Sequence, residues 1–211
     1  MANTPATTAA ALTKKEQLVQ AAFVLGILVA AMWGLELIDW MSGHWLDQHF
    51  GIIPREPAGL IGLVGSPFMH ANVAHLAANT IPFFVLGLFV ALRGIPTFVK
   101  TSLFVMFVGG MLVWLFARNA DHIGASGVIF GYFGYLLAVG VFERSFSAIL
   151  IAAVVALLYG GIIFGVIPSD PRVSWEGHLF GFLSGGTWAY LSGGRKRLAD
   201  KQAQSKTPAR V

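Results

Sequence analysis

Apolar residues fill six long runs of this 211-residue chain, and polar residues gather in the short stretches between the runs. Each run has about the ~20 residues that a helix needs to cross the hydrocarbon core of a bilayer. A backbone in lipid must satisfy its own hydrogen bonds, so the pattern predicts an all-α membrane protein. The predicted spans cover residues 19–41, 72–93, 97–117, 125–142, 147–167 and 175–193.

The composition agrees with this pattern. Hydrophobic residues make up 56% of the chain and charged residues 11%, whereas a soluble domain carries about 25% charged residues. The chain has no cysteine, which excludes disulfides, thiolate metal sites and cysteine nucleophiles. We expect a flexible cytoplasmic tail at 1–18, one six-helix domain at 19–194 and a basic cytoplasmic tail at 195–211.

Lys and Arg are distributed unevenly between the two sides of the predicted bundle. With the N-terminus inside, eleven of the fourteen lie on the inner flanks, and only Arg55, Arg118 and Arg172 lie outside. Multi-pass proteins carry this excess on the cytoplasmic side, so we expect both termini in the cytoplasm of a cell-membrane protein. The basic tail suits an anionic lipid surface better than a nucleic acid, which is not an expected partner.

The connection at 42–71 differs from the other loops. It is apolar but repeatedly interrupted by glycine and proline, which predicts an external loop lying partly in the membrane; a plain surface loop is the alternative. Glu36 and Asp39 are three residues apart at the outer end of the first span and share a helix face toward the loop or water. His44 and His49 are interpreted as loop residues.

Four polar side chains are predicted to reach the same depth. In this orientation the second, fourth and sixth spans all begin at the outer face. His75 and Asn79 lie in the first two turns of the second span, Ser126 at the start of the fourth and His178 in the first turn of the sixth. At a rise of ~1.5 Å per residue, all four lie just below the outer surface. We therefore expect them to form one site.

Ser126 and His178 are the candidates for a nucleophile and its base. The small neighbours of Ser126 expose its hydroxyl, and the backbone amides at a helix start are unsatisfied donors that suit an oxyanion. A histidine inside a membrane is by default functional or partnered. The alternatives are a serine bonded to its own backbone and a histidine that makes a structural hydrogen bond.

Two rows of glycines would let the fourth and sixth spans approach closely. Contact between the rows would bring His178 within hydrogen-bond reach of Ser126, although the glycines could also serve packing alone. The rows are Gly127 and Gly131 on the fourth span, and Gly177, Gly181 and Gly185 on the sixth.

The remaining histidines leave alternatives open. His75 and Asn79 are four residues apart, share a helix face and can both donate hydrogen bonds to an oxyanion. His122 is a rival base, although it falls in the loop before the fourth span, and His70 is interpreted as a loop or interface residue. His70, His75, His122 and His178 match no metal-ligand spacing, so neither a metal nor a cofactor is expected.

Three motifs, in this order and within six spans, resemble the rhomboid family of intramembrane serine proteases over about residues 19–194. The motifs are His70-Ala-Asn-Val-Ala-His75-Leu-Ala-Ala-Asn79, Gly124-Ala-Ser126-Gly127-Val-Ile-Phe130-Gly131 and Gly177-His178-Leu-Phe-Gly181. Many bacterial members carry a Trp-Arg pair in the first external loop. Here the nearest basic residue is Arg55.

The resemblance implies a six-helix rhomboid-like bundle and a Ser126–His178 dyad without a third acid. It also implies an oxyanion hole made of His75, Asn79 and the Ser126 amide beside Gly124, with the ring of Phe130 against the catalytic histidine. The implied substrates are single-span membrane proteins, cut near the external face without a metal or cofactor. A polytopic transporter and a non-proteolytic rhomboid-like binding protein are the alternatives.

Overall fold

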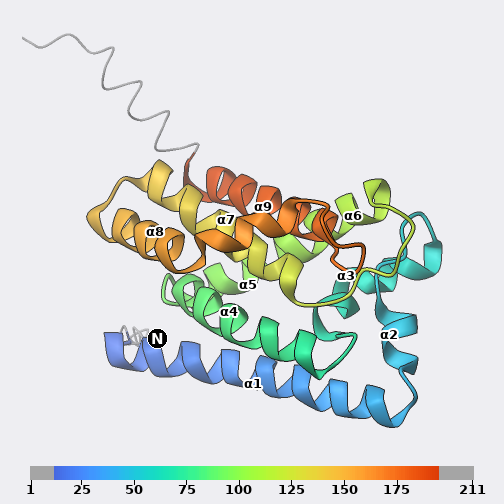
Figure 1. Ribbon diagram of the computed structural model, residues 1–211. Coiled ribbons are helices and arrows are strands. Elements are labelled where there is room, and N and C mark those ends of the chain that lie inside the picture. Colours follow the sequence, from blue (N-terminus) through green and yellow to red (C-terminus); the bar gives the residue numbers. More distant parts are fainter. Residues whose placement is uncertain (1–11, 195–211) are drawn as a thin grey trace, which may run out of the picture.

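The computed structural model describes residues 12–194, which form a bundle of helices (Figure 1). Within this range the only β-pairing is an isolated bridge between Ile52 and His122, so the predicted all-α architecture is confirmed. The α-helices are α1 (Lys14–Met41), α2 (Trp45–Phe50), α3 (Gly62–Gly65), α4 (Val73–Ala91), α5 (Ile95–Phe104), α6 (Gly110–Phe116), α7 (Ser126–Glu143), α8 (Phe146–Tyr159) and α9 (Trp175–Ala189). Shorter 3₁₀ or π segments are η1 (Pro57–Ile61), η2 (Ser66–Phe68), η3 (Val105–Gly109), η4 (Gly160–Val166) and η5 (Tyr190–Gly194).

Five helical stretches in residues 12–194 are long and apolar enough to cross a membrane. They are α1, α4, the continuous α5–η3–α6, α7 and the continuous α8–η4. The sixth predicted span corresponds to α9, whose 15 residues continue into the five-residue π-helical segment η5. The chain is therefore a multi-pass membrane protein.

Helix α1 begins before the predicted span does. Thr13 caps it: the Thr13 hydroxyl accepts from the Glu16 amide at 3.2 Å, and Glu16 Oε2 accepts from the Thr13 amide at 2.8 Å. This reciprocal capping box starts the helix at Lys14. Residues 14–18, assigned to the flexible tail from their polarity, are therefore helical. The rest of the predicted tails lies largely at 1–11 and 195–211, outside the described residues.

Helix α7 is the centre of the bundle. Of its 18 residues 61% are buried, and Figure 1 shows α1, α4, α7 and α9 following one another across the molecule. Helices α1 and α8 at the edges expose large apolar side chains, such as Phe23 and Leu157. An apolar surface of this extent suits contact with lipid rather than water.

The two glycine rows lie against each other in the contact between α7 and α9. A Cβ atom on Gly181 would lie 2.1 Å from the Gly127 carbonyl oxygen, and one on Gly185 would lie 1.9 Å from that of Gly131. No side chain fits at these distances, so the two backbones touch directly. This contact sets the spacing between the starts of α7 and α9.

We predict that Gly185→Ala destabilises the protein, because its methyl group would push α9 away from α7. Overpacking of this kind costs ~1–3 kcal/mol or more. Gly186 is the matched control, since a Cβ atom there meets nothing within 4 Å. Gly186→Ala should leave the thermal midpoint unchanged or slightly higher, because alanine favours a helix. Equal midpoints for the two variants in detergent would contradict the close contact.

Candidate active site

Ser126 and His178 meet where α7 and α9 begin. Ser126 Oγ lies 2.9 Å from His178 Nε2, and His178 Nδ1 lies 2.8 Å from the carbonyl oxygen of Gly165. A carbonyl oxygen only accepts hydrogen bonds, so Nδ1 carries the ring hydrogen and Nε2 has the free lone pair. The Ser126 hydroxyl therefore donates to Nε2. This arrangement suits transfer of the serine proton to the ring.

The imidazole of His178 is held by an aromatic ring and a backbone group. Phe130, one turn after Ser126, stacks on it with ring centroids 4.2 Å apart and planes 4° from parallel. A Cβ atom on Gly165 would lie 3.0 Å from both His178 Nδ1 and Phe130 Cζ, so η4 packs directly on the pair. Gly165 was not among the site residues predicted from the sequence. The sequence feature that could have indicated it is a group of glycines at the end of an otherwise apolar span.

Gly124 brings His75 and Asn79 to the serine. Its φ of +110° favours glycine, and a Cβ atom there would lie 2.7 Å from His75 Cε1 and 3.7 Å from Asn79 Nδ2. Asn79 Nδ2 donates one hydrogen to the His75 carbonyl oxygen at 3.1 Å, which leaves its second amide hydrogen for another acceptor. The structure thus places both side chains next to the loop that leads into Ser126.

A cleft of about 830 Å³ opens at these residues. Its walls come from α4 on one side and η4 on the other, and the segment 170–174 forms part of its rim. The polar side chains that line it include those of Ser126, His178, His75 and Asn79. An extended peptide lying in this cleft would therefore pass between the dyad and the two donors.

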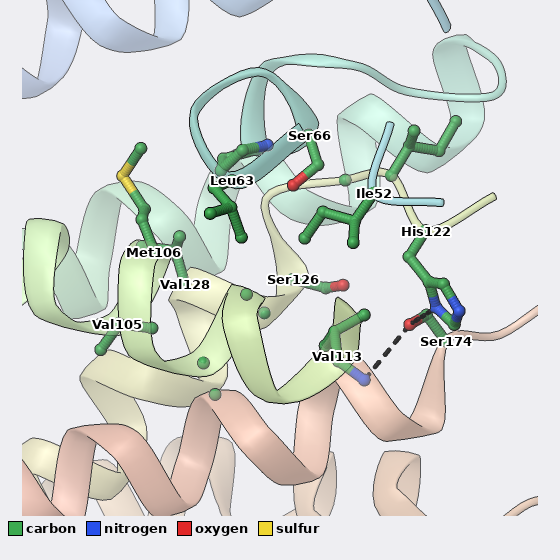
Figure 2. Close-up of a pocket in the computed structure, with 18 residues that line it drawn as sticks. Ile52, Leu63, Ser66, Val105, Met106, Val113, His122, Ser126, Val128 and Ser174 are labelled. Carbon is green, nitrogen blue, oxygen red and sulfur yellow. Dashed lines mark hydrogen bonds between the residues drawn. The ribbon is translucent and has the colours of Figure 1, made fainter. Parts of the chain in front are cut away.

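A smaller pocket of about 50 Å³ lies behind Ser126, under the first long loop, which we define as residues 42–72. Figure 2 shows Ser126 in this pocket, with Ile52, Leu63 and Ser66 of the loop above it. The loop is attached to the serine segment because the Gly124 amide donates to the Ser66 carbonyl oxygen at 2.8 Å. The loop therefore covers the site.

His122 makes structural hydrogen bonds and is not placed as the base for Ser126. Its Nε2 donates to the Arg118 carbonyl oxygen at 3.1 Å, and its Nδ1 accepts from Ser174 Oγ at 2.7 Å. Ser174 caps α9 by accepting from the Gly177 amide at 3.2 Å. Burial lowers the pKa of His122, which favours this neutral form. Both ring nitrogens are used, and they hold the helix end that carries His178.

His70 lies closer to the site than its interpretation as a loop or interface residue implies. Its side chain is buried, its Nε2 accepts from the Ala125 amide at 3.3 Å, and its ring packs edge-on against His75 with centroids 5.1 Å apart. Burial first, and then the charge of His75, lower the pKa of His70 to about 4. A neutral His70 thus links the oxyanion candidate to the segment before Ser126.

An ion pair that was not predicted from the sequence joins the segment after α6 to the first turn of α9. Arg118 Nη1 lies 3.2 Å from the buried carboxylate of Glu176, and Nη2 donates to the carbonyl oxygens of Pro171 and Val173 at 3.0 and 2.7 Å. The signal in the sequence was an acidic residue in the first turn of an apolar span. The pair fixes the start of α9 against the end of α6.

We predict that acid weakens the fold partly through His70. In the unfolded chain the His70 ring takes up a proton below the ordinary pKa of 6.5. In the folded chain the pKa of His70 is about 4, so the ring stays neutral to a lower pH. The stability from the neutral ring is complete above pH 6.5 and falls as the pH drops toward 4, by up to about 3 kcal/mol. The thermal midpoint of His70→Gln should fall less steeply over this range than that of the wild type.

The exposed His49 supplies the control for this measurement. The midpoint of His49→Gln should follow the wild-type curve between pH 6.5 and 4. A His70→Gln curve parallel to the wild type would show that His70 does not contribute to the acid response.

The chain is similar to a known domain family and to several known proteins. The rhomboid domain model matches residues 57–195. An uncharacterized protein of Mycobacterium tuberculosis is 40% identical over 204 residues, which cover 92% of this chain and 85% of that protein. An uncharacterized protein of Mycobacterium leprae is 40% identical over 191 residues, covering 85% and 75% of the two chains. RHOMBOID-like protein 1 of Arabidopsis thaliana is 32% identical over 121 residues, covering 56% and 31%.

Proposed function

This chain belongs to the rhomboid family, and we propose on that basis that it is a serine endopeptidase that cleaves peptide bonds of membrane-spanning proteins. The observation that carries the proposal is the 2.9 Å contact between Ser126 Oγ and a His178 Nε2 whose lone pair faces the serine. A nucleophile, a base and an orienting group for the base are the three parts that acyl transfer by serine needs. Here the Gly165 carbonyl oxygen, with the ring of Phe130, takes the place of the orienting carboxylate.

The reaction begins with proton transfer inside the dyad. As Ser126 Oγ forms a bond to the substrate carbonyl carbon, its proton passes to His178 Nε2. The Nδ1–H bond to Gly165 steadies the resulting imidazolium. The ring then gives its proton to the leaving amine as the C–N bond breaks. A water molecule next attacks the acyl-enzyme with His178 as the base again; the bond between Ser126 Oγ and the acyl carbon breaks, and His178 returns the proton to Oγ.

The negative charge of the intermediate forms on the former carbonyl oxygen of the substrate. The donors for it are the His75 ring, the free amide hydrogen of Asn79 and the backbone amide of Ser126, which opens α7. Amides in the first turn of a helix have no partner within the helix and are available to an oxyanion. Such donors stabilise the transition state more than the ground state because charge develops only there.

The proposed substrates are single-span membrane proteins. A peptide bond inside a helix is shielded by its own hydrogen bonds, so the substrate must unwind to lie in the cleft between α4 and η4. Segments with glycine or other helix-breaking residues near the membrane boundary unwind at the lowest cost. Neither a metal nor a cofactor enters this sequence of steps.

We further propose that the cleft faces the exterior and that both termini are cytoplasmic. Arg118 and Arg172 line the rim of the cleft, whereas Arg93 and Arg144 follow α4 and α7 at their other ends. With the basic tail, this distribution follows the positive-inside rule. A reporter fused to the C-terminus would contradict the proposal if it were active only outside the cell.

We predict that Ser126→Ala abolishes both turnover of a membrane substrate and labelling by a fluorophosphonate probe. His178→Ala should lower turnover by ~10²–10⁴-fold, because positioned general-base help is lost. Ser184→Ala, which removes a buried serine of α9 outside the dyad, should still be labelled. A fluorescent probe on a gel and cleavage of a single-span substrate measure the two effects. Labelling of Ser126→Ala at the wild-type level would rule out this nucleophile.

We predict that Asn79→Ala lowers kcat by ~10²–10³-fold with little change in KM, because an oxyanion donor acts mainly in the transition state. His75 and the backbone amide remain, so a loss of about tenfold is the lower bound. The exposed Asn119 provides the control, and Asn119→Ala should keep the wild-type kcat. A raised KM with normal kcat would assign Asn79 to substrate binding instead.

A further inference from the structure

Asp39, His44 and Asp47 meet where α1 connects to α2. One carboxylate oxygen from each aspartate and one ring nitrogen of His44 all lie within 4.8 Å of one another. We propose that this cluster binds a divalent transition-metal ion, of which Zn²⁺ is the representative, and that the ion joins α1 to the first long loop. The proposal is independent of the proteolytic function.

Two buried carboxylate oxygens at this cluster have no partner, and a bound cation could supply one. Glu36, one helical turn before Asp39 on the same face, is only 6% exposed, and Asp47 is 7% exposed. Glu36 Oε2 and Asp47 Oδ1 have no hydrogen-bond partner. Glu36 also lies close enough to Asp39 and His44 for electrostatic interaction with them. Unpaired buried carboxylates are costly, and a bound cation would remove that cost.

The first long loop shows the same excess of negative charge. Asp47 is buried close to the carboxylates of Asp39 and Glu36. His44 is the nearest compensating group, at 2.8 Å from Asp39 Oδ2 through its Nδ1. A single imidazole faces three carboxylates here. A divalent ion would supply positive charge in the same space.

The ligand types favour zinc over calcium. Imidazole nitrogen suits transition metals, whereas Ca²⁺ and Mg²⁺ prefer oxygen ligands throughout. Bonds of ~2.0–2.2 Å to one Zn²⁺ put ligand atoms at most ~4.4 Å apart. The three ligand atoms lie within 4.8 Å of one another, so they would have to approach by a few tenths of an ångström to bind one ion. The ring of His44 is 47% exposed, which leaves a path for an ion from water.

The backbone already positions the ligands. Gly43 and His44 have φ values of +71° and +63°, which turn the chain back toward α1. Asp39 Oδ1 accepts from the amides of Leu46 and Asp47 at 2.8 and 3.1 Å, so α2 is attached to α1 through a proposed ligand. Hydrogen bonds of this kind orient metal ligands in known sites.

The ion would stabilise the loop that covers Ser126. Helix α2 ends at Phe50, whose carbonyl oxygen packs against Gly65 of α3, and Ile52 then pairs with His122 through two backbone hydrogen bonds of 3.0 Å. His122 in turn holds the cap of α9. The role of the ion is therefore structural, at the far end of the loop from the dyad.

The test is metal binding by the purified full chain in detergent. After treatment with a chelator, the protein is titrated with Zn²⁺, and bound metal is counted by mass spectrometry after desalting. We expect one Zn²⁺ per chain and a higher thermal midpoint in its presence. His44→Asn and Asp47→Asn should each weaken binding by at least ~10-fold, since even loss of a supporting partner costs 10–100-fold. Asparagine tolerates the left-handed conformation of position 44.

The controls separate this cluster from other metal-binding groups. His49→Gln removes the exposed imidazole next to the site, and Asp170→Asn removes a carboxylate at the cleft rim. Both should bind Zn²⁺ like the wild type. The midpoints of all variants without metal show that each one folds. Absence of Zn²⁺ binding, unchanged binding in both cluster variants, or tighter binding of Ca²⁺ than of Zn²⁺ would overturn the proposal.

Discussion

The close contact between the α7 and α9 backbones is the constraint on which the rest of the site depends. Gly181 and Gly185 lie so near the carbonyl oxygens of Gly127 and Gly131 that no side chain fits between the helices. In lipid, helices do not associate through the hydrophobic effect, and small residues allow the van der Waals contact that replaces it. The spacing of the two helix starts, and with it the 2.9 Å contact of Ser126 with His178, follows from this packing.

Much of the site is oriented by backbone groups rather than by charged side chains. The Gly165 carbonyl oxygen orients His178, the Ala125 amide donates to His70, and the Ser66 carbonyl oxygen holds the Gly124 amide. Ionised side chains are costly at membrane depth. Peptide groups supply dipoles in fixed directions without that cost. In the Arg118–Glu176 ion pair, the buried carboxylate of Glu176 is paired with a partly exposed guanidinium that lines the cleft.

The first long loop connects the edge of the bundle to its centre. It leaves α1 through the Asp39–His44–Asp47 cluster, covers the pocket behind Ser126 and reaches Gly124 through Ser66. Disturbance at the cluster would therefore reach the serine segment through the backbone pairing of Ile52 with His122. The loop is long because it links three parts of the molecule that the spans alone do not bring together.

The sequence by itself determined the helical architecture and much of the candidate site. Lipid requires internally hydrogen-bonded segments of a set length, so hydrophobicity located the second span at 72–93, close to the observed α4 (Val73–Ala91). The glycine rows and the motif around Ser126 pointed to the meeting of α7 and α9, because small residues are visible in a sequence. At Thr13, local capping started the first span earlier than its hydrophobicity indicated.

The tertiary structure decided which backbone groups and distant loops complete the site. Every residue has a carbonyl oxygen, so nothing in the residue types singled out Gly165 as the acceptor for His178. The use of both His122 nitrogens in holding α9 depended on Ser174, which lies 52 residues away. The grouping of Glu36 and Asp39 with His44 and Asp47 followed from a left-handed turn at 43–44. These contacts arise from packing in three dimensions, which residue type and spacing alone do not determine.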